Sequence, residues 1–365
     1  MEKLKILYAA STASHLRRFH QPYIQHLKQE HDVRLMATEG EGIDFPIAFS
    51  KSFFSLGNLR EILHIRKILK QEAFDRVIVH TTLAAFLIRA AMIGMRHRPF
   101  VLNVVHGYLF SKPVKGMRAK ILLLCEKLVR GQTDAIAVMN REDLELAKQY
   151  RLTDGKMTFL FGMGIPSFDA IPAPEPSLRA SFADDGELLC SFVGELSARK
   201  NQIFLVRAFA RLRREGLPVR LLLLGEGGMR ETLEQEISNL DAKNFITLAG
   251  NREPILPYLA ATDVYVSAST SEGLPFNVME AMACGLPIVA SDTKGQNDLL
   301  EQTTAILYPL DDEDAFCDAI RMLHASGIRG VGSCSYENLN AYGLSEVFED
   351  NMKVLLEGAN ETTSR

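Results

Sequence analysis

The chain has 365 residues, of which 47% are hydrophobic, and a formal net charge of -4. A chain of this size buries a large core and exceeds the usual length of one domain, so two domains are expected. Its five cysteines are widely spaced without a Cys-x-x-Cys pair, which argues against a disulfide framework or a cysteine zinc site. The first residues lack the apolar core of a signal peptide, and the longest apolar stretch, 83–95, is too short to span a bilayer. A cytoplasmic protein is expected.

Charge is divided unequally between the two halves of the chain. Residues 1–165 contain 25 Lys and Arg against 15 Asp and Glu, which leaves +10. Residues 166–365 contain 16 against 30, which leaves -14. The two halves are therefore expected to bind different partners, or each other.

Strands and helices alternate along the first half. Buried strand runs are predicted at 4–11, 31–40, 74–80, 99–107 and 134–140. Helical spacing of apolar residues is predicted at 15–31, 59–73, 81–95 and 115–131. This alternation predicts right-handed βαβ units and a parallel sheet.

A proline-rich stretch separates this half from a second alternating region. Prolines at 166, 172, 174 and 176 predict a linker. Strands are then expected at 187–196, 219–227, 244–250, 263–269 and 304–310, and helices at 201–216, 228–240, 252–261 and 312–326. Two doubly wound α/β halves joined in this way would face a cleft lined by the carboxyl ends of both sheets.

Residues 270–295 contain two glutamates eight positions apart. Glu272 is expected on a loop and Glu280 on a short helix that begins at the cap residue Asn277 and stops at Gly285. Free backbone N–H groups of residues 273–278 would suit a phosphate, and a carboxylate suits two sugar hydroxyls. Acids near a helix start also simply complement the helix dipole, and the spacing alone does not decide between these roles.

The stretch "SEGLPFNVMEAMACGLPIVASDTKG" resembles the signature of the GT-B glycosyltransferases of family 4. The segments "FVGELSARKNQ", "LLLLGEGGMRETLE", "FITLAG" and "TAILYPLDDEDAFCDAI" extend the similarity over residues 185–325. The resemblance implies two Rossmann-like, doubly wound parallel-sheet domains that face a cleft. It implies an acceptor-binding domain at 1–165, a linker at 166–185, a nucleotide-sugar-binding domain at 186–341 and a last helix at 342–358 packed back on the first domain.

The same resemblance implies a donor site. Glu280 would bind the ribose, Glu272 the donor sugar, and Lys200 the diphosphate, where a cation stabilises the charge of the leaving group. The arginine usual in the family is replaced by Glu195, and Arg199 is the hypothesised substitute because a guanidinium binds phosphate in a bidentate manner. The other implied donor contacts are Gly194, Arg252, Gly273, Leu274, Pro275, Phe276 and Asn277.

The resemblance in the first half covers two stretches. "VLNVVHGYLF" is similar to the family's strand that ends in His-Gly, which implies a catalytic role for His106 near the reacting carbon, with Gly107 beside it. A purely structural role is the alternative for a lone histidine. "ASTASHLRRFHQPYIQHL" resembles the first loop of capsular and exopolysaccharide members but lacks the usual glycine pair. It implies acceptor-side contacts by Ser11, Ser14 and His15.

No Asp-x-Asp pair suited to nucleotide-bound Mg²⁺ follows a strand, so no metal ion and no cofactor is expected. The resemblance implies a retaining, metal-independent transfer of a hexose or N-acetylhexosamine from a UDP-sugar to a lipid-linked saccharide in surface polysaccharide synthesis. The basic residues of 111–131 predict peripheral contact with an anionic membrane at its inner face, with a core-facing helix as the alternative. Nucleic acid is not expected as a partner, because no aromatic residues interleave the basic ones.

Two other functions remain open. A UDP-sugar 2-epimerase shares the fold but would need an acid and a base placed for proton abstraction. A non-catalytic partner subunit of a transferase is the second, suggested by Glu195 and the glycine-poor first loop. Nucleotide binding and slow release of UDP from UDP-sugars would separate these functions.

Overall fold

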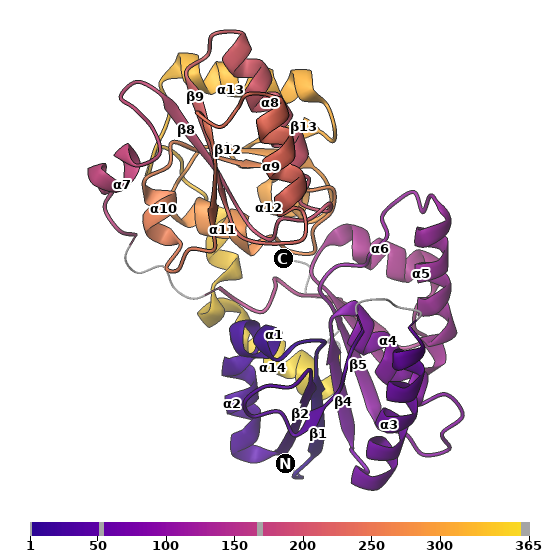
Figure 1. The fold of residues 1–365 in the computed structure, drawn as a ribbon. Coiled ribbons are helices and arrows are strands. Elements are labelled where there is room, and N and C mark those ends of the chain that lie inside the picture. Colours follow the sequence, from indigo (N-terminus) through magenta and orange to yellow (C-terminus); the bar gives the residue numbers. More distant parts are fainter. Residues whose placement is uncertain (1, 51–54, 166–170, 359–365) are drawn as a thin grey trace. The chain divides into compact units, whose positions relative to one another are not determined.

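The computed structural model describes residues 2–50, 55–165 and 171–358, and the chain divides into two units (Figure 1). The first unit contains Met1–Ile165 and Ala341–Arg365, and the second contains Pro166–Asn340. Part of the predicted linker, residues 166–170, lies outside the described residues. A short helix, α7 (Pro176–Ala180), occurs within the rest of it.

The first unit contains a seven-stranded sheet with the order β3-β2-β1-β4-β5-β6-β7, and every pairing is parallel. β1, β4, β5 and β6 are buried almost throughout, as expected for parallel strands covered on both faces. The strands are β1 (Lys5–Ala9), β2 (Asp32–Ala37), β3 (Phe45–Pro46), β4 (Arg76–His80), β5 (Phe100–Val105), β6 (Ala135–Val138) and β7 (Lys156–Phe159). The order reverses between β1 and β4, which creates a switch point at their carboxyl ends.

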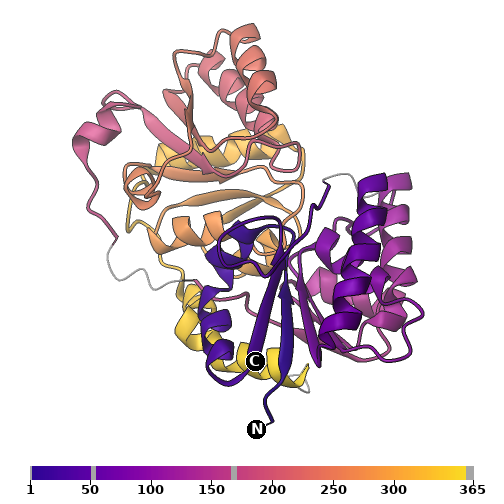
Figure 2. The ribbon, with the colours of Figure 1, turned by 60° about the horizontal axis from the view of Figure 1, so that its bottom comes forward.

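Helices cover both faces of this sheet. One face carries α1 (Ala13–Phe19), α2 (Gln21–Glu30) and α14 (Leu344–Glu357), as Figure 2 shows. The other carries α3 (Leu56–Glu72), α4 (Thr82–Ala91) and α5 (Met117–Leu128). The helix α6 (Arg141–Tyr150) and the strand β7 were not predicted, and the short helix η1 (Arg130–Gln132) follows α5.

The prediction of one continuous helix over 15–31 is wrong. The chain leaves the helical conformation at His20, where φ is -122° and ψ is -4°, and α2 begins again with Pro22 in its first turn. Proline lacks an N–H and clashes with the preceding turn inside a helix, but it is well tolerated at a helix start. The break leaves His20 fully buried.

The helix α14 is anchored in the first unit by a buried amide. Asn351 Nδ2 donates to the Tyr23 hydroxyl and to the Gly162 carbonyl oxygen, both at 2.9 Å. The ring of Phe348 stacks on that of Tyr23 with centroids 5.0 Å apart. These contacts join a helix near the end of the chain to α2 and to the segment that follows β7.

Asn351→Ala is expected to destabilise the first unit by about 1–3 kcal/mol, because two buried acceptors lose their donor. Urea denaturation followed by circular dichroism measures this change. Lys353→Ala, on an exposed position of the same helix, is the control and should change stability by less than about 0.5 kcal/mol. Equal stability of the two variants would contradict the anchoring role.

The second unit contains a six-stranded parallel sheet with the order β10-β9-β8-β11-β12-β13. Its strands are β8 (Leu188–Val193), β9 (Val219–Leu224), β10 (Ile246–Gly250), β11 (Val264–Ser267), β12 (Ile288–Asp292) and β13 (Ile306–Pro309). One face carries α8 (Gln202–Arg214), α9 (Arg230–Asn239) and α13 (Glu313–Ser326) (Figure 1). The other carries α10 (Leu256–Ala260), α11 (Phe276–Ala283) and the unpredicted α12 (Gln296–Leu300). The short helix η2 (Glu337–Tyr342) begins in this unit and ends in the first.

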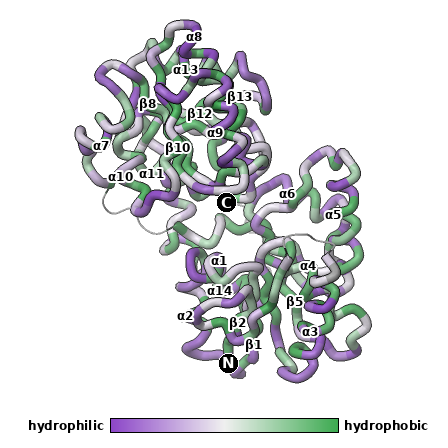
Figure 3. The backbone as a smooth tube through the Cα atoms, in the orientation of Figure 1, coloured by the Kyte–Doolittle hydropathy of each residue, from purple (hydrophilic) through white to green (hydrophobic). Residues whose placement is uncertain are grey.

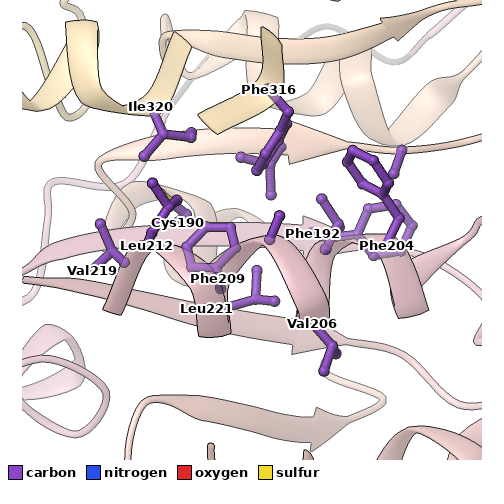
Figure 4. Close-up of a cluster of buried hydrophobic side chains, with 14 of the residues drawn as sticks. Cys190, Phe192, Phe204, Val206, Phe209, Leu212, Val219, Leu221, Phe316 and Ile320 are labelled. Carbon is purple, nitrogen blue, oxygen red and sulfur yellow. The ribbon is translucent and has the colours of Figure 1, made fainter. Parts of the chain in front are cut away.

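The core of the second unit lies between β8, β9, α8 and α13. Leu205, Phe209 and Leu212 recur at helical spacing on α8 and are fully buried. Phe209 meets Phe316 of α13 with ring centroids 6.1 Å apart (Figure 4). This packing fixes α8 on the sheet and thereby the loop that connects β8 to α8.

All five cysteines are free thiols.

The strands β1, β4 and β5 are coloured largely as hydrophobic in Figure 3. Within the described ranges, none of the helices combines the length and the apolar character that crossing a bilayer requires. The helix α5 nevertheless leaves Met117, Leu124 and Leu128 exposed, each by more than 60%. Leu122 and Leu123 of the same helix point into the core.

Candidate functional site

The candidate site of the second unit forms at the carboxyl ends of β8 and β11, where the strand order reverses. The chain leaves β8 through Gly194, whose φ of +149° favours glycine. A Cβ at this position would lie 3.2 Å from the Phe192 ring and 3.5 Å from Lys200 Cε. The contact with Lys200 would be an ordinary one, so the backbone conformation and the close Phe192 ring favour glycine here.

Two cations meet one carboxylate at this edge. Lys200 Nζ lies 2.6 Å from Glu272 Oε1, and Arg199 Nη1 lies 2.6 Å from Glu272 Oε2. Arg199 also donates to the Ser271 carbonyl oxygen at 2.9 Å. Lys200 and Glu272 are each only 7% exposed, whereas the Arg199 side chain is 43% exposed. All three residues were predicted to belong to the donor site, but their contacts with one another were not predicted.

Burial and charge act against each other in this cluster. Burial raises the pKa of Glu272, but Lys200 and Arg199 outweigh it and hold this pKa below its usual value. Burial lowers the pKa of Lys200, and Glu272 only partly offsets this effect. The cluster thus holds a buried ammonium group whose charge depends on an anionic partner.

The loop that carries Glu272 is fixed from both sides. The Thr270 N–H donates to the Arg199 carbonyl at 2.8 Å, and the Glu272 N–H donates to the Lys294 carbonyl at 3.2 Å. Gly295 has φ +78°, and a Cβ there would lie 2.7 Å from the carbonyl oxygens of Glu272 and Gly273. A side chain at position 295 would therefore displace this loop.

The helix α11 begins at Phe276, and Pro275 rather than the predicted Asn277 occupies its cap position. Pro275 makes no side-chain cap hydrogen bond. Asn277 Nδ2 instead donates to the Val193 carbonyl at 2.7 Å and lies 2.6 Å from the Tyr265 hydroxyl oxygen. The amide thus ties α11 to the ends of β8 and β11, a tertiary demand that overrides its local capping preference.

The other predicted donor residues occupy varied positions. Glu280 lies half-buried on α11, and Gly273, Leu274 and Phe276 are half-buried before it while Pro275 is buried. The N–H of residue 278, predicted to be free, donates to the Pro275 carbonyl at 3.1 Å because it already belongs to the first turn of the helix. Arg252 is exposed, with its guanidinium 6.0 Å from the centre of the Tyr258 ring, and Glu195 is exposed.

Four histidines of the first unit converge near its own switch point. His106 follows β5, and its Nε2 lies 3.1 Å from Nδ1 of His80, the last residue of β4. His15 Nε2 lies 3.2 Å from His20 Nε2, and the rings of His15 and His106 are 4.7 Å apart. His20 Nδ1 lies 3.0 Å from the Tyr8 hydroxyl oxygen. The structure therefore brings together the predicted residues His15 and His106.

Burial keeps these imidazoles neutral. It lowers the pKa of His15 to about 4, and it lowers the pKa of His106 well below its usual value, with a further lowering by His15. Burial also lowers the pKa of His80 and of His20 well below 6.5, and the neighbouring histidines add to this effect. At neutral pH each ring therefore retains one unprotonated nitrogen.

The other residues predicted on the acceptor side also belong to the first unit. The Ser11 and Thr81 hydroxyl oxygens lie 2.6 Å apart at the ends of β1 and β4. Ser14 is exposed and hydrogen-bonds locally to Thr12 at 3.2 Å, and Gly107 has φ +116°. His20 and His80 were not predicted as site residues. His20 lies in the stretch "ASTASHLRRFHQPYIQHL" that resembles the family's first loop, and His80 lies at the end of a predicted strand.

The comparison with family models gives one match. A family described as "Glycosyl transferases group 1" matches residues 187–326, which include Lys200, Glu272 and Glu280. His106 lies outside the matched range.

Two curated proteins show similarity over most of the chain. The Bacillus subtilis protein named "Putative glycosyltransferase EpsD" is 29% identical over 333 residues, which cover 88% of this chain and 87% of that protein. An Escherichia coli UDP-Gal:alpha-D-GlcNAc-diphosphoundecaprenol alpha-1,3-galactosyltransferase is 24% identical over 272 residues, which cover 72% of this chain and 70% of that protein.

Solved structures share the architecture. HepE from Anabaena in complex with UDP and glucose has a TM-score of 0.74 at 18% identity, and 97% of this chain and 100% of that chain are covered. Sucrose-phosphate synthase from Thermosynechococcus elongatus has a TM-score of 0.76 at 16% identity, and the alignment covers 97% of this chain and 100% of that chain. The chain thus has the predicted GT-B fold, and the family model with the curated relatives supports a glycosyltransferase.

Proposed function

We propose that the protein is a retaining glycosyltransferase that moves a hexose or N-acetylhexosamine from a UDP-sugar to a lipid-linked saccharide in surface polysaccharide synthesis. The observation that carries this proposal is the Lys200–Glu272–Arg199 cluster, followed eight residues later by Glu280, within the matched residues. The donor and acceptor classes follow the names of relatives that act on saccharides linked to diphosphoundecaprenol. Their assignment to this chain is part of the proposal.

In the proposed donor complex the diphosphate takes over the two cations. Lys200 and Arg199 stabilise the negative charge that develops on the leaving UDP, and this step requires no metal ion at the diphosphate. Arg199 is well suited to bind phosphate from solvent, because its side chain is 43% exposed while Lys200 is held in the buried part of the cluster. Arg199 then supplies the positive charge that the family's usual arginine would provide, because Glu195 occupies that arginine's position.

Glu272 and Glu280 are proposed to bind different parts of the donor. Once the diphosphate attracts the cations, the Glu272 carboxylate accepts hydrogen bonds from hydroxyls of the donor sugar. Glu280 accepts them from the ribose, and the backbone from Gly273 to Phe276 lies along the sugar and diphosphate. Asn277 positions α11 rather than the donor, since its amide nitrogen already binds β8.

The acceptor is proposed to bind the first unit. His106 contacts the reacting sugar, and the acceptor contacts come from Ser11, Ser14, His15 and Gly107. A lipid-linked acceptor also needs the protein near a membrane surface. The exposed Met117, Leu124 and Leu128 of α5, with Lys120 and Lys127 beside them, fit peripheral contact with an anionic bilayer.

The test is UDP binding measured by calorimetry on the full chain. Glu280→Ala is expected to weaken UDP binding about 10- to 100-fold, because a charged acceptor of ribose hydrogen bonds contributes roughly 1.5–3 kcal/mol. Glu231→Ala, an exposed acid on α9, is the control and should bind UDP like the wild type. Arg199→Ala should weaken binding as well, and unchanged affinity would remove Arg199 from the proposed site.

Two results would overturn the proposed function. If the wild-type protein binds no UDP or UDP-sugar, the non-catalytic partner subunit becomes the better description. If it binds a UDP-sugar and changes the configuration at C2 without releasing UDP, it is an epimerase. Slow hydrolysis of one UDP-sugar among a panel, with release of UDP, would support the transferase.

A further inference from the structure

The histidine cluster of the first unit gathers side chains from four separate parts of the chain. His15 comes from α1, His20 from the break before α2, and His106 from the residue after β5. His80 ends β4, and Tyr8 lies on β1 beneath the rings of His20 and His80 at centroid distances of 5.6 and 4.8 Å. Polar rings meet here at the switch point of a parallel sheet, a frequent place for ligands.

We propose that His15, His20 and His106 bind one divalent transition-metal ion of the zinc type. Each residue offers a nitrogen ligand, and the three ligand atoms all lie within 4.8 Å of one another. Imidazole nitrogens are ligands that zinc, copper and nickel ions accept readily.

One pair of the proposed ligand nitrogens already has the spacing of a metal site. Zinc–nitrogen bonds of 2.0–2.1 Å at a tetrahedral angle place neighbouring ligand nitrogens roughly 3.3 Å apart. His15 Nε2 and His20 Nε2 are 3.2 Å apart. The third ligand nitrogen, within 4.8 Å of the other two, has to approach by up to roughly 1.5 Å to reach this spacing.

Outer partners orient the ligand rings as they do in zinc sites. A ligating histidine usually donates its second ring N–H to a neighbouring acceptor, which leaves the other nitrogen bare for the metal. The Tyr8 hydroxyl lies 3.0 Å from His20 Nδ1, opposite the nitrogen that faces His15. His80 holds the His106 ring through its contact of 3.1 Å.

The protonation and exposure of the cluster also suit a metal ion. A ligating imidazole has to be neutral, and burial keeps these rings so. His20 is fully buried, whereas His15 and His106 are half-buried. A zinc ion held by three histidines has a fourth coordination position for water or a ligand oxygen. The donor site of the second unit contributes nothing to this set, whereas His15 and His106 also belong to the proposed acceptor site. Zinc loading and UDP binding are measured separately, so either proposal can fail without the other.

The experiment uses the full chain without a polyhistidine tag. After incubation with Zn²⁺ and desalting, elemental analysis is expected to find one zinc per wild-type chain, and competition with a chromophoric chelator measures its affinity. His15→Ala and His106→Ala should each lose more than about 100-fold in affinity, since even an outer partner contributes 10- to 100-fold. His64→Ala, which removes an exposed histidine of α3, is the matched control and should keep the wild-type affinity.

Two further measurements do not depend on a ligand variant that folds. X-ray absorption of the zinc-loaded wild type should show nitrogen scatterers at 2.0–2.1 Å with the multiple-scattering pattern of imidazole. Tyr8→Phe keeps the shape of a buried ring and should weaken zinc binding about 10- to 100-fold. A wild type that retains no zinc, an oxygen-only zinc environment, or equal affinity in His15→Ala, His106→Ala and His64→Ala would each overturn the proposal.

Discussion

Glu272→Ala is expected to lower the free energy of unfolding of the second unit by about 3–5 kcal/mol and to abolish sugar transfer. The destabilisation arises because Lys200 stays buried after its counter-charge is removed, so its pKa must fall further. Arg199 contributes less to this loss, since its exposed guanidinium can turn to water. Urea denaturation and a transfer assay on the same samples measure the two effects.

Two variants separate stability from activity. Glu272→Leu combined with Lys200→Met removes both charges and should restore most of the stability, because apolar replacements of a buried ion pair are often neutral or better. It should not restore transfer. UDP affinity of Glu272→Ala is expected to fall less than that of Glu280→Ala, since both cations remain for the diphosphate. Unchanged stability, or an equal loss of UDP affinity in these two variants, would contradict the assignment.

The effect of Glu272 also has a defined pH dependence. Its cationic neighbours hold its pKa below the usual value, so the stability it contributes is fully present above the unfolded-state pKa of about 4.3. This contribution is lost as the pH falls through the lower pKa of the folded state. The difference in stability between wild type and Glu272→Ala should therefore narrow in acid.

The fold was predictable because its elements are periodic and fully covered. Runs such as 219–224 are almost continuously apolar, as strands buried on both faces must be, and α8 shows its stripe at helical spacing. The break at His20 was not predictable from periodicity, because Leu16, Tyr23 and Leu27 keep helical spacing across it and are all buried. Only Pro22 marked that position.

The contacts among the predicted site residues could not be predicted from the sequence. Lys200 and Glu272 are 72 positions apart and meet only because β8 lies next to β11 in the sheet. The four histidines stand at 15, 20, 80 and 106, a spacing that matches no metal motif. Their meeting depends on the strand order β1-β4-β5, which no local pattern contains.

A second buried ion pair, in the first unit, should be as costly to break. Arg89 Nη2 lies 3.0 Å from both carboxylate oxygens of Glu126, Arg89 is fully buried and Glu126 is 3% exposed. Arg89 also donates to the Ala85 carbonyl at 2.8 Å and to the Thr133 hydroxyl at 3.2 Å, so its donors stay aligned. Glu126→Ala is expected to destabilise the first unit by about 3–5 kcal/mol in urea denaturation.

The pair also matters for the histidine cluster, because Arg89, Glu126 and His106 line one small cavity beneath the end of β5. Loss of the carboxylate leaves the guanidinium buried without a counter-charge, whereas Arg89→Met with Glu126→Leu removes both charges and should recover most of the lost stability. Glu145→Ala, which breaks the exposed pair with Lys112, is the control and should cost less than about 1 kcal/mol. An equally small loss of stability in Glu126→Ala and Glu145→Ala would contradict this prediction. It would mean that water reaches Arg89 and that the cavity beside His106 is less tightly packed than the burial of Arg89 indicates.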